Sequence, residues 1–374
     1  MRGSFRLGNV FGIEIDINYT WLIVFVLVTW SLAAGFFPQE FPGWPISTYW
    51  LVGVIASLLL FASVLLHELA HSLVAQREGL PITNITLFIF GGVSNIQREP
   101  TNPKDEFRMA FVGPLSSIFI GVFTWVLLVI FGSVNVQLQA VLLYLTIINL
   151  MLAAFNLIPA FPLDGGRVFR SIVWWATHSL TRATRIASAV GQGFGYLIIF
   201  VGLLLLFTGN FLGGVWLVLI GWFLTYAAES SYRQLVVQET LRGIPVRDMM
   251  AQDVPTVTPN VTVRELVDRY ILPRNIRALP VVHDSQLVGM VTLSDVQHVS
   301  QEEWDTTDVG RIMTPRERLH ALAPQDDAVQ ALEAMGEQDV NQLPVVSDGK
   351  VVGLVTRGHI IRLLQVRQDL GARR

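Results

Sequence analysis

Cysteine is absent from the 374-residue sequence, and charged residues make up only 15% of it. Without cysteine the chain has no disulfide framework and no thiolate nucleophile. The formal net charge of -3 leaves no basic surplus, so we expect no nucleic-acid partner. The sequence is instead rich in apolar residues: 52% of it is hydrophobic, which is typical of a membrane protein.

The apolar residues are concentrated in the first part of the chain, up to about Tyr226. Six stretches approach the roughly 20 residues that a helix needs to cross the bilayer core. They are Trp21–Phe37, Trp50–Leu73, Phe111–Phe131, Leu138–Ile158, Tyr196–Phe207 and Leu212–Ala228. Pro38 is expected to end the first of them. The first 18 residues lack the pattern of a signal peptide. The sequence predicts a membrane domain over residues 1–230, followed by a soluble part.

The distribution of lysine and arginine predicts the orientation of these spans. The connections 37–49, 132–137 and 208–211 contain neither residue, so all three belong to one side of the membrane. The basic residues of the opposite side are Arg2, Arg6, Arg77, Arg98, Lys104, Arg108, Arg167, Arg170, Arg182, Arg185 and Arg233. By the positive-inside rule that side is cytoplasmic. We therefore expect a multi-pass protein of the cell membrane whose soluble part is cytoplasmic.

The second apolar stretch contains a His-Glu-x-x-His pattern, from His67 to His71. Residues four apart share one face of a helix, so both imidazoles can bind one ion, with Glu68 one residue further round. Two histidines leave positions for a third protein ligand and a water, as in catalytic zinc sites. Glu68 would take a proton from that water. A solvated charged face is disfavoured, because an ionisable side chain at membrane depth costs roughly 2.5–3.5 kcal/mol.

A second polar cluster lies at the end of the fourth span, between Asn156 and Gly166. Pro159 and Pro162 break the helix there and present Asp164, whose carboxylate is a natural third ligand for zinc. The amide of Asn156 would hold a substrate backbone or a developing oxyanion. The alternative is that Asp164 caps a helix over residues 165–175.

Residues 84–93, between the second and third spans, are apolar and rich in β-formers, and they end in a double glycine. Irregular backbone at membrane depth is tolerated where it lines a protein cavity, so we expect a re-entrant strand beside the metal. Its edge, from Leu87 to Phe90, is expected to pair with an extended substrate peptide. Phe90, Gly91 and Gly92 are therefore candidate substrate-binding residues. The alternative is an interfacial hairpin without a binding role.

The soluble part contains an internal repeat. The segment Leu279-Pro280-Val281-Val282 and the Gly-x-Val-Thr pattern after it recur as Leu343-Pro344-Val345-Val346 and a second such pattern. The repeat predicts two β-rich units, at residues 245–300 and 308–366, with amphipathic helices between the strands.

The membrane part resembles the site-2 protease family of intramembrane zinc metalloproteases. The resemblance rests on the pattern from His67 to His71 and on Asn156 to Gly166, which follows the family's Asn-x-x-Pro-x-x-x-Leu-Asp-Gly pattern. It implies one zinc ion held by His67, His71 and Asp164, with Glu68 as the general base. It also implies cleavage of peptide bonds within or near transmembrane segments of membrane-protein substrates, in regulated proteolysis.

The repeats resemble a tandem pair of cystathionine-β-synthase (CBS) domains, a family that often binds adenine nucleotides. Its Gly-x-x-Thr-x-x-Asp pattern implies that Thr292 and Asp295 bind ATP or AMP. The second copy offers Thr356 but has His359 in place of the acid. We expect a homodimer formed through these domains and cleavage that adenine nucleotide modulates. The alternative is a module for dimerisation without a ligand.

The sequence therefore predicts a polytopic α-helical membrane protein of about six spans with a C-terminal α/β tandem CBS module. Two other functions stay open at this point. One is a transporter or channel regulated by the CBS pair, which leaves Glu68 between two histidines without a role. The other is a catalytically dead scaffold, which would tolerate loss of Glu68 or Asp164, although both are present.

Overall fold

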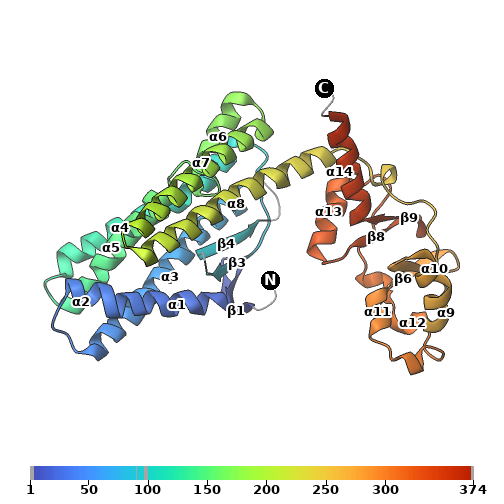
Figure 1. Cartoon of the computed structure of the whole chain (residues 1–374), viewed down its shortest axis with the longest axis horizontal. Coiled ribbons are helices and arrows are strands. Elements are labelled where there is room, and N and C mark those ends of the chain that lie inside the picture. Colours follow the sequence, from blue (N-terminus) through green and yellow to red (C-terminus); the bar gives the residue numbers. More distant parts are fainter. Residues whose placement is uncertain (1–3, 90, 97–99, 372–374) are drawn as a thin grey trace. The chain divides into compact units, whose positions relative to one another are not determined.

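The computed structural model describes residues 4–89, 91–96 and 100–371. It consists of two compact units, the first ending at Arg233 and the second beginning at Gln234. Figure 1 labels the helices and strands of both. The last helix of the first unit, α8, continues into the second along the chain.

Six helices in the described part of the chain are long and apolar enough to cross a membrane. They are Thr20–Glu40, which comprises α1 (Thr20–Ser31), a π-helical turn (Leu32–Phe36) and α2 (Phe37–Glu40), then α3 (Ile46–Arg77), α4 (Pro103–Phe131), α5 (Val136–Asn156), α7 (Leu180–Phe207) and α8 (Phe211–Leu241). The predicted fold class is confirmed. Pro38 does not end the first helix, because the π-helical turn before it already interrupts the regular hydrogen-bond ladder.

These helices expose apolar side chains outward and pair polar ones between them. Leu27, Phe119 and Trp222 are more than half exposed, as suits surfaces that face lipid. Inside, Thr29 donates a hydrogen bond to Ser57 at 3.0 Å, joining α1 to α3. Hydroxyl and amide contacts of this kind hold apolar helices together where no hydrophobic effect operates between them.

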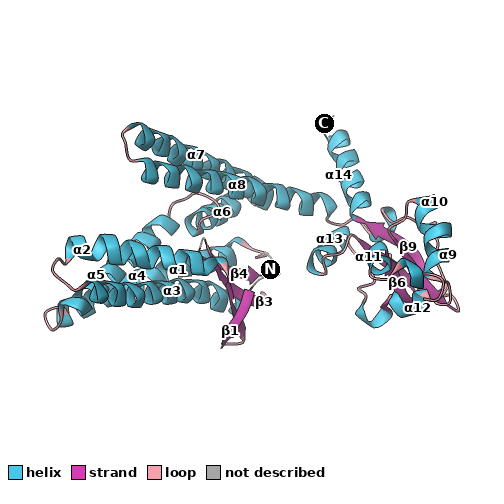
Figure 2. Ribbon diagram, turned by 60° about the horizontal axis from the view of Figure 1, so that its bottom comes forward, coloured by secondary structure: helices cyan, strands magenta, loops and turns pink. Residues whose placement is uncertain are grey.

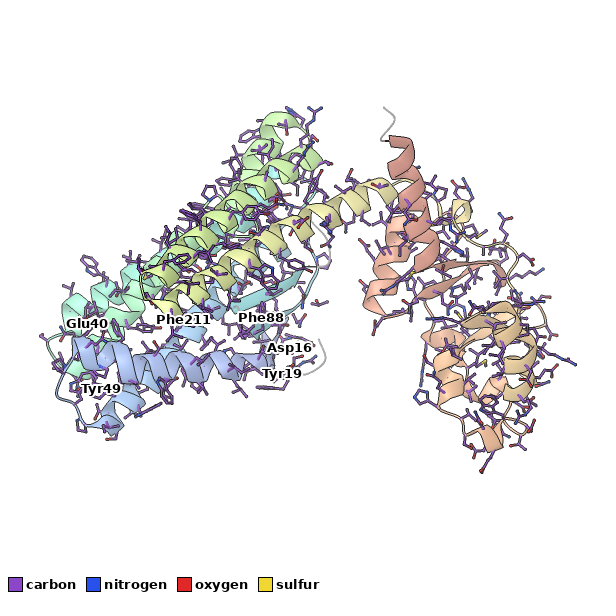
Figure 3. The ribbon with its side chains drawn as sticks, viewed as in Figure 1. Asp16, Tyr19, Glu40, Tyr49, Phe88 and Phe211 are labelled. Carbon is purple, nitrogen blue, oxygen red and sulfur yellow. The ribbon has the colours of Figure 1, made fainter. Side chains whose placement is uncertain are left out.

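A four-stranded sheet adjoins the helices. It contains β1 (Ser4–Val10), β2 (Ile13–Asn18), β3 (Ile82–Phe88) and β4 (Gly91–Ile96), in the spatial order β1-β2-β3-β4. Figure 2 shows it at one end of α1 and α3, and Figure 3 places Asp16, Tyr19 and Phe88 at that end and Glu40 at the other. Ile13 and Ile85 are fully buried against Leu69 of α3, so the sheet packs on the helical turn that carries the His-Glu-x-x-His pattern.

The sheet corrects the expected substrate edge. Leu87 pairs with Ile17 of β2 on one side and with Gly92 of β4 on the other, so β3 is an interior strand. Gly91 and Gly92 begin β4, which is the edge strand, and do not close β3. The predicted exposed edge ran from Leu87 to Phe90. At Leu87 this prediction is wrong, because β2 of the unforeseen β1–β2 hairpin pairs with it. Phe90 lies outside the described residues.

The second unit contains two similar β-hairpins with helices around them. Its elements are α9 (Val263–Glu265), a π-helical turn (Leu266–Ile271), α10 (Leu272–Arg274), β5 (Ala278–His283), β6 (Gln286–Thr292), α11 (Leu293–Gln297), α12 (Val309–Ile312), β7 (Thr314–Pro315), α13 (Ala328–Glu337), β8 (Gln342–Ser347), β9 (Lys350–Thr356) and α14 (Arg357–Gly371), with short 3-10 turns at Val246–Asp248, Gln301–Glu303 and Arg316–Arg318. Leu279 pairs with Val291 in the first hairpin, and Leu343 pairs with Val355 in the second. The two halves thus repeat in structure as they do in sequence.

Candidate metal centre

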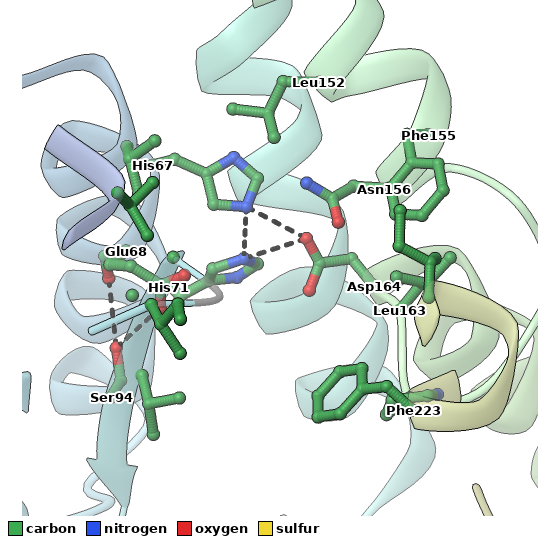
Figure 4. A pocket seen from close by; sticks show the side chains of 18 of the residues that line it. His67, Glu68, His71, Ser94, Leu152, Phe155, Asn156, Leu163, Asp164 and Phe223 are labelled. Atoms are coloured by element: carbon green, nitrogen blue, oxygen red, sulfur yellow. Dashed lines mark hydrogen bonds and ion pairs between the residues drawn. The ribbon is translucent and has the colours of Figure 1, made fainter. Parts of the chain in front are cut away.

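Three polar side chains from two distant parts of the chain meet where the second span faces the start of α6. His67 and His71 lie on α3, both are buried, and their Nε2 atoms are 3.2 Å apart. Asp164 belongs to α6 (Asp164–Thr177), and its Oδ2 lies 3.1 Å from His67 Nε2 and 3.2 Å from His71 Nε2. Figure 4 shows the three groups converging on one point. The structure thus brings together the three predicted metal ligands.

Helix α4 sets the orientation of both imidazoles. His71 Nδ1 lies 2.6 Å from the carbonyl oxygen of Met109, which only accepts, so this nitrogen carries a proton and Nε2 bears a lone pair when the ring is neutral. His67 Nδ1 lies 2.9 Å from Ser117 Oγ. A Cβ atom at Gly113, between them on α4, would lie 2.1 Å from His71 Nε2. The close passage of α4 therefore requires glycine at this position.

These donor atoms fit a metal ion. Neutral imidazoles present two lone pairs, and Asp164 adds a carboxylate oxygen, with all three atoms within 4.8 Å of one another. Such acceptors repel one another unless a cation or proton lies among them. Two histidines and one carboxylate form a donor set typical of catalytic zinc, and the hydrogen bonds to Nδ1 are of the kind that orients zinc-binding histidines.

The loop before α6 explains why Asp164 reaches the histidines. Leu163 is the N-cap residue of α6 and Asp164 opens its first turn, so the alternative that Asp164 itself caps the helix is wrong. A Cβ at Gly165 would lie 2.3 Å from the carbonyl oxygen of Leu157, and one at Gly166 would lie equally close to a backbone nitrogen. The double glycine allows the loop to fold tightly onto itself and place Asp164 across from α3.

Glu68 faces the edge strand of the sheet. Its Oε2 accepts a hydrogen bond of 3.1 Å from Ser94 Oγ of β4, and Ser72 Oγ of α3 donates to Ser94 Oγ at 3.0 Å. A Cβ at Gly92 would lie 2.4 Å from Glu68 Cγ. Sequence reasoning missed Ser94 and Ser72. Side chains two apart on a strand point to the same face, so the position of Ser94 two residues after Gly92 was the signal that both face the metal site.

The metal centre opens into a cavity of about 590 Å³. Its walls are mainly apolar and come from α1, α3, β4, α5, α6 and α8. Asn156 contributes a polar amide from α5, and Figure 4 shows it on the same side as Asp164. Gly91 and Gly92, which the sequence predicted to bind substrate together with Phe90, also line the cavity and so lie beside the metal site. A cavity of this size, lined by apolar side chains with a few polar groups, is typical of binding sites.

A buried ion pair links α4 to α6. Glu106 is fully buried on α4, and its Oε1 accepts a hydrogen bond of 2.6 Å from Arg170 Nε of α6. The guanidinium of Arg170 also lies 5.1 Å from the centre of the Phe161 ring, in the loop that precedes Asp164. Sequence reasoning used Arg167 and Arg170 only for membrane orientation. The spacing of three residues, from Asp164 to Arg167 and from Arg167 to Arg170, was a signal that each of these pairs is adjacent on the helix surface.

In the second unit, the predicted nucleotide-binding residues hold one another. Asp295 Oδ2 accepts hydrogen bonds from Thr292 N at 2.8 Å and Thr292 Oγ1 at 2.7 Å, and Asp295 N donates to Thr292 Oγ1 at 3.2 Å, which completes a capping box at the start of α11. Thr356 Oγ1 accepts a bond of 3.2 Å from His359 N. A cavity of about 360 Å³ is lined by His359, Arg362 and the segment Asp248–Ala251. Burial lowers the pKa of His359, and the charge of Arg362 lowers it further.

Comparison with known proteins decides the family. The model of peptidase family M50 matches residues 55–139 and 132–202, and the CBS domain model matches 246–302 and 309–366. "Putative zinc metalloprotease sll0528" of Synechocystis sp. is 36% identical, over 98% of this chain and 96% of the relative. "Putative zinc metalloprotease Rip3" of Mycobacterium tuberculosis is 34% identical, over 98% and 94%. The chain belongs to the M50, or site-2 protease, family of zinc metallopeptidases.

The solved structure of the site-2 protease from Methanocaldococcus jannaschii is 31% identical to this chain. The match covers 61% of this chain and 94% of that one, with a TM-score of 0.42. The similarity to these two relatives extends over the tandem CBS domains, because each alignment covers nearly the whole of both chains. It favours a metallopeptidase over a transporter or channel, and it agrees with a multi-pass membrane protein.

Proposed function

We propose that this M50 peptidase hydrolyses peptide bonds within or near transmembrane segments of membrane-protein substrates. The observation that carries the proposal is the convergence of His67, His71 and Asp164 at the wall of an apolar cavity among membrane spans. A soluble peptidase has no need of such a setting, because ionisable residues inside spans are costly and usually serve a site.

In this proposal His67, His71 and Asp164 hold one zinc ion. When bound, zinc lowers the pKa of a water toward about 7 and polarises the carbonyl that is attacked. Glu68 takes the proton from the attacking water and delivers it to the leaving nitrogen. Ser94 donates a hydrogen bond to Glu68 and so holds the carboxylate in place. No side chain acts as nucleophile, so we expect no acyl-enzyme.

The substrate is proposed to bind as an extended strand along β4. Because β4 is the last strand of the described sheet, its outer backbone groups have no strand partner and can pair with a peptide. Pairing compensates for the hydrogen bonds that a substrate helix loses when it unwinds. Gly91 and Gly92 allow close approach of the peptide, and the amide of Asn156 holds its backbone from the opposite wall.

The decisive experiment compares zinc content and cleavage in matched variants of the full-length protein. Wild type, Glu68→Gln and His67→Ala are purified, analysed for zinc, and co-expressed with candidate single-span proteins. We expect Glu68→Gln to keep zinc but accumulate uncut precursor, and His67→Ala to lose both zinc and cleavage. Cleavage by Glu68→Gln at the wild-type rate would refute the proposed role of Glu68.

The remaining assignments concern the second unit. We propose that it is cytoplasmic, because the connections that carry the basic residues lie on the same side of the proposed topology as the C-terminal end of the last span, from which the second unit follows. We propose that the membrane domain comprises residues 1–230 and that the two CBS domains comprise residues 245–300 and 308–366. We further propose that the protein forms a homodimer through the CBS domains, to be tested by sedimentation in detergent.

Adenine nucleotide is proposed to bind at Thr292 and Asp295, with Thr356 in the second repeat, and to change the cleavage rate. Coupling requires ATP or AMP to favour one arrangement of the CBS halves over another. Calorimetry on wild type and Asp295→Ala tests the site, and cleavage of one substrate with and without nucleotide tests the coupling. Absence of binding at millimolar nucleotide would leave the module with dimerisation alone.

A further inference from the structure

Arg167 lies in the cavity of the metal centre, one helical turn after Asp164 on α6. Its side chain is 24% exposed, whereas that of Arg170, one turn further, is 4% exposed. Residues three apart lie on the same side of a helix, so Arg167 is positioned beside the metal ligand, at the cavity wall. The two arginines of α6 therefore differ in surroundings.

The two arginines also differ in how they contact Glu106. Arg170 donates to Glu106 Oε1 through Nε at 2.6 Å and approaches the same oxygen through Nη2. Arg167 approaches that oxygen no closer than 3.9 Å, through Nε. This is its sole carboxylate contact within the part of the chain that the structure describes, and its guanidinium donates no hydrogen bond there. Its planar set of donors is thus available to a ligand.

The surroundings of Arg167 make it a selective group. Apart from the histidines, the other ionisable side chains among the described residues of the cavity are Glu68 and Asp164, and both belong to the metal centre. Most of the remaining walls are apolar. In such a low-dielectric space, a guanidinium pairs strongly with a carboxylate and repels an ammonium group.

We propose that Arg167 binds a carboxylate of the substrate and so selects which transmembrane segments are cut. The carboxylate comes from an acidic side chain at the end of the segment, or from the C-terminus of a shortened substrate. This inference rests on the proposed protease function. Most spans carry lysine or arginine at their cytoplasmic end, where α6 lies in the proposed orientation. Arg167 repels these segments, which is selection against the wrong partner.

The test uses full-length, zinc-loaded protein and a single-span substrate whose boundary residue is Asp, Asn or Lys. In a series of substrates, this residue is placed at each successive position near the end of the transmembrane segment. Wild type is expected to cleave the Asp substrate with a kcat/KM at least about tenfold higher than the Lys substrate, at one or two positions. Arg167→Gln should lose this preference, and Arg167→Glu should prefer Lys. That reversal is a result a merely structural role of Arg167 would not produce.

Two controls define the source of the effect. Arg185→Gln removes an exposed cation of α7, which does not line the cavity, and should keep the preference. A second substrate pair ends at the preferred position with either a free carboxylate or an amide. If the substrate with the free carboxylate is cleaved faster than its amide, Arg167 binds a chain terminus. If instead only the internal Asp substrate is cleaved faster than its Asn and Lys counterparts, Arg167 binds a side-chain carboxylate.

Binding to the Glu68→Gln protein separates this inference from the proposed function. That variant retains the metal ligands, so the affinities of the three substrates can be measured without cleavage. Equal affinities for Asp, Asn and Lys substrates at every position overturn the role of Arg167, whether or not wild type cleaves them. Preferential binding of the Asp substrate, lost in the Arg167→Gln double variant, supports the inference even if hydrolysis by wild type is absent and the proposed function fails.

Discussion

The two units of this protein use the same residue type in opposite ways. Asp164 of the membrane unit and Asp295 of the CBS unit both lie in the first turn of a helix. Asp295 accepts hydrogen bonds from Thr292, three residues earlier, and completes a local cap. Asp164 has Phe161 at the equivalent position and instead meets two histidines that lie about ninety positions earlier in the sequence. The comparison teaches that a carboxylate without a local partner is the one free to build a long-range site.

The largest expected difference between the two aspartates is in zinc binding. Asp164→Ala should lower zinc from about one per chain to a small fraction after dialysis, and should reduce cleavage by roughly a thousandfold or more. In the absence of nucleotide, Asp295→Ala should change neither, because its carboxylate bonds to Thr292 within the CBS unit and contacts none of the metal-binding residues. Zinc analysis of the two purified variants checks this. Full retention of zinc in Asp164→Ala would remove that residue from the ligand set.

A second prediction removes no ligand at all. Gly113→Ala would place a methyl group 2.1 Å from His71 Nε2 and 2.8 Å from His67 Nε2, so it should displace the imidazoles and lower zinc affinity by roughly a hundredfold. Gly193→Ala on α7 is the matched control, since its Cβ meets nothing within 4 Å. Competition with a zinc chelator measures both variants. Equal affinity in the two would show that α4 does not constrain the histidines.

The third prediction compares ion pairs in the two units. Glu106→Gln breaks a fully buried pair with Arg170 and should destabilise the membrane unit by about 3–5 kcal/mol, because an unpaired charge stays buried. Glu265→Gln breaks an exposed pair with Arg269 and should cost less than about 1 kcal/mol. Thermal unfolding in detergent, followed by circular dichroism, compares them. Equal midpoints would mean that water reaches Glu106.

The fourth prediction concerns the link between Glu68 and the edge strand. Ser94→Ala should lower kcat about tenfold with zinc content unchanged, because the Glu68 carboxylate loses the hydroxyl that holds it. Ser72→Ala should have a smaller effect, since Ser72 donates to Ser94 and not to Glu68. Single-turnover cleavage separates chemistry from binding. A change confined to KM would indicate that Ser94 serves the substrate strand instead.

The smallest effect is expected at the local cap. Thr292→Ala removes the hydroxyl that caps α11 and should lower the local free energy of opening by about 1 kcal/mol. Thr356→Ala should cost less, because its hydroxyl accepts only the His359 amide among the described contacts. Hydrogen exchange of the α11 and α14 amides in the full-length protein measures both. Identical protection in the two variants would show that the capping box adds nothing.

Much of the site was predictable because its patterns are short. His67 and His71 are separated by one helical turn, and the break at Pro159 and Pro162 marks where Asp164 emerges from the fourth span. The number of spans followed from apolar length alone. The predicted edge at Leu87 failed because strand order depends on β2, a partner some seventy residues away, and hydrophobic pattern does not reveal which strand pairs with which.

By itself, the sequence determined the elements whose cause is local: helices of span length, the repeat of the second unit, and residue types able to bind zinc. Only the tertiary structure decided which groups meet. It placed Gly113 against two imidazoles, Ser94 on Glu68, and Arg167 in the cavity, where its Nε is 3.9 Å from the Glu106 oxygen that Arg170 binds. The physical reason is that these contacts join segments far apart in the chain, where packing of whole helices, and not local propensity, sets the distance.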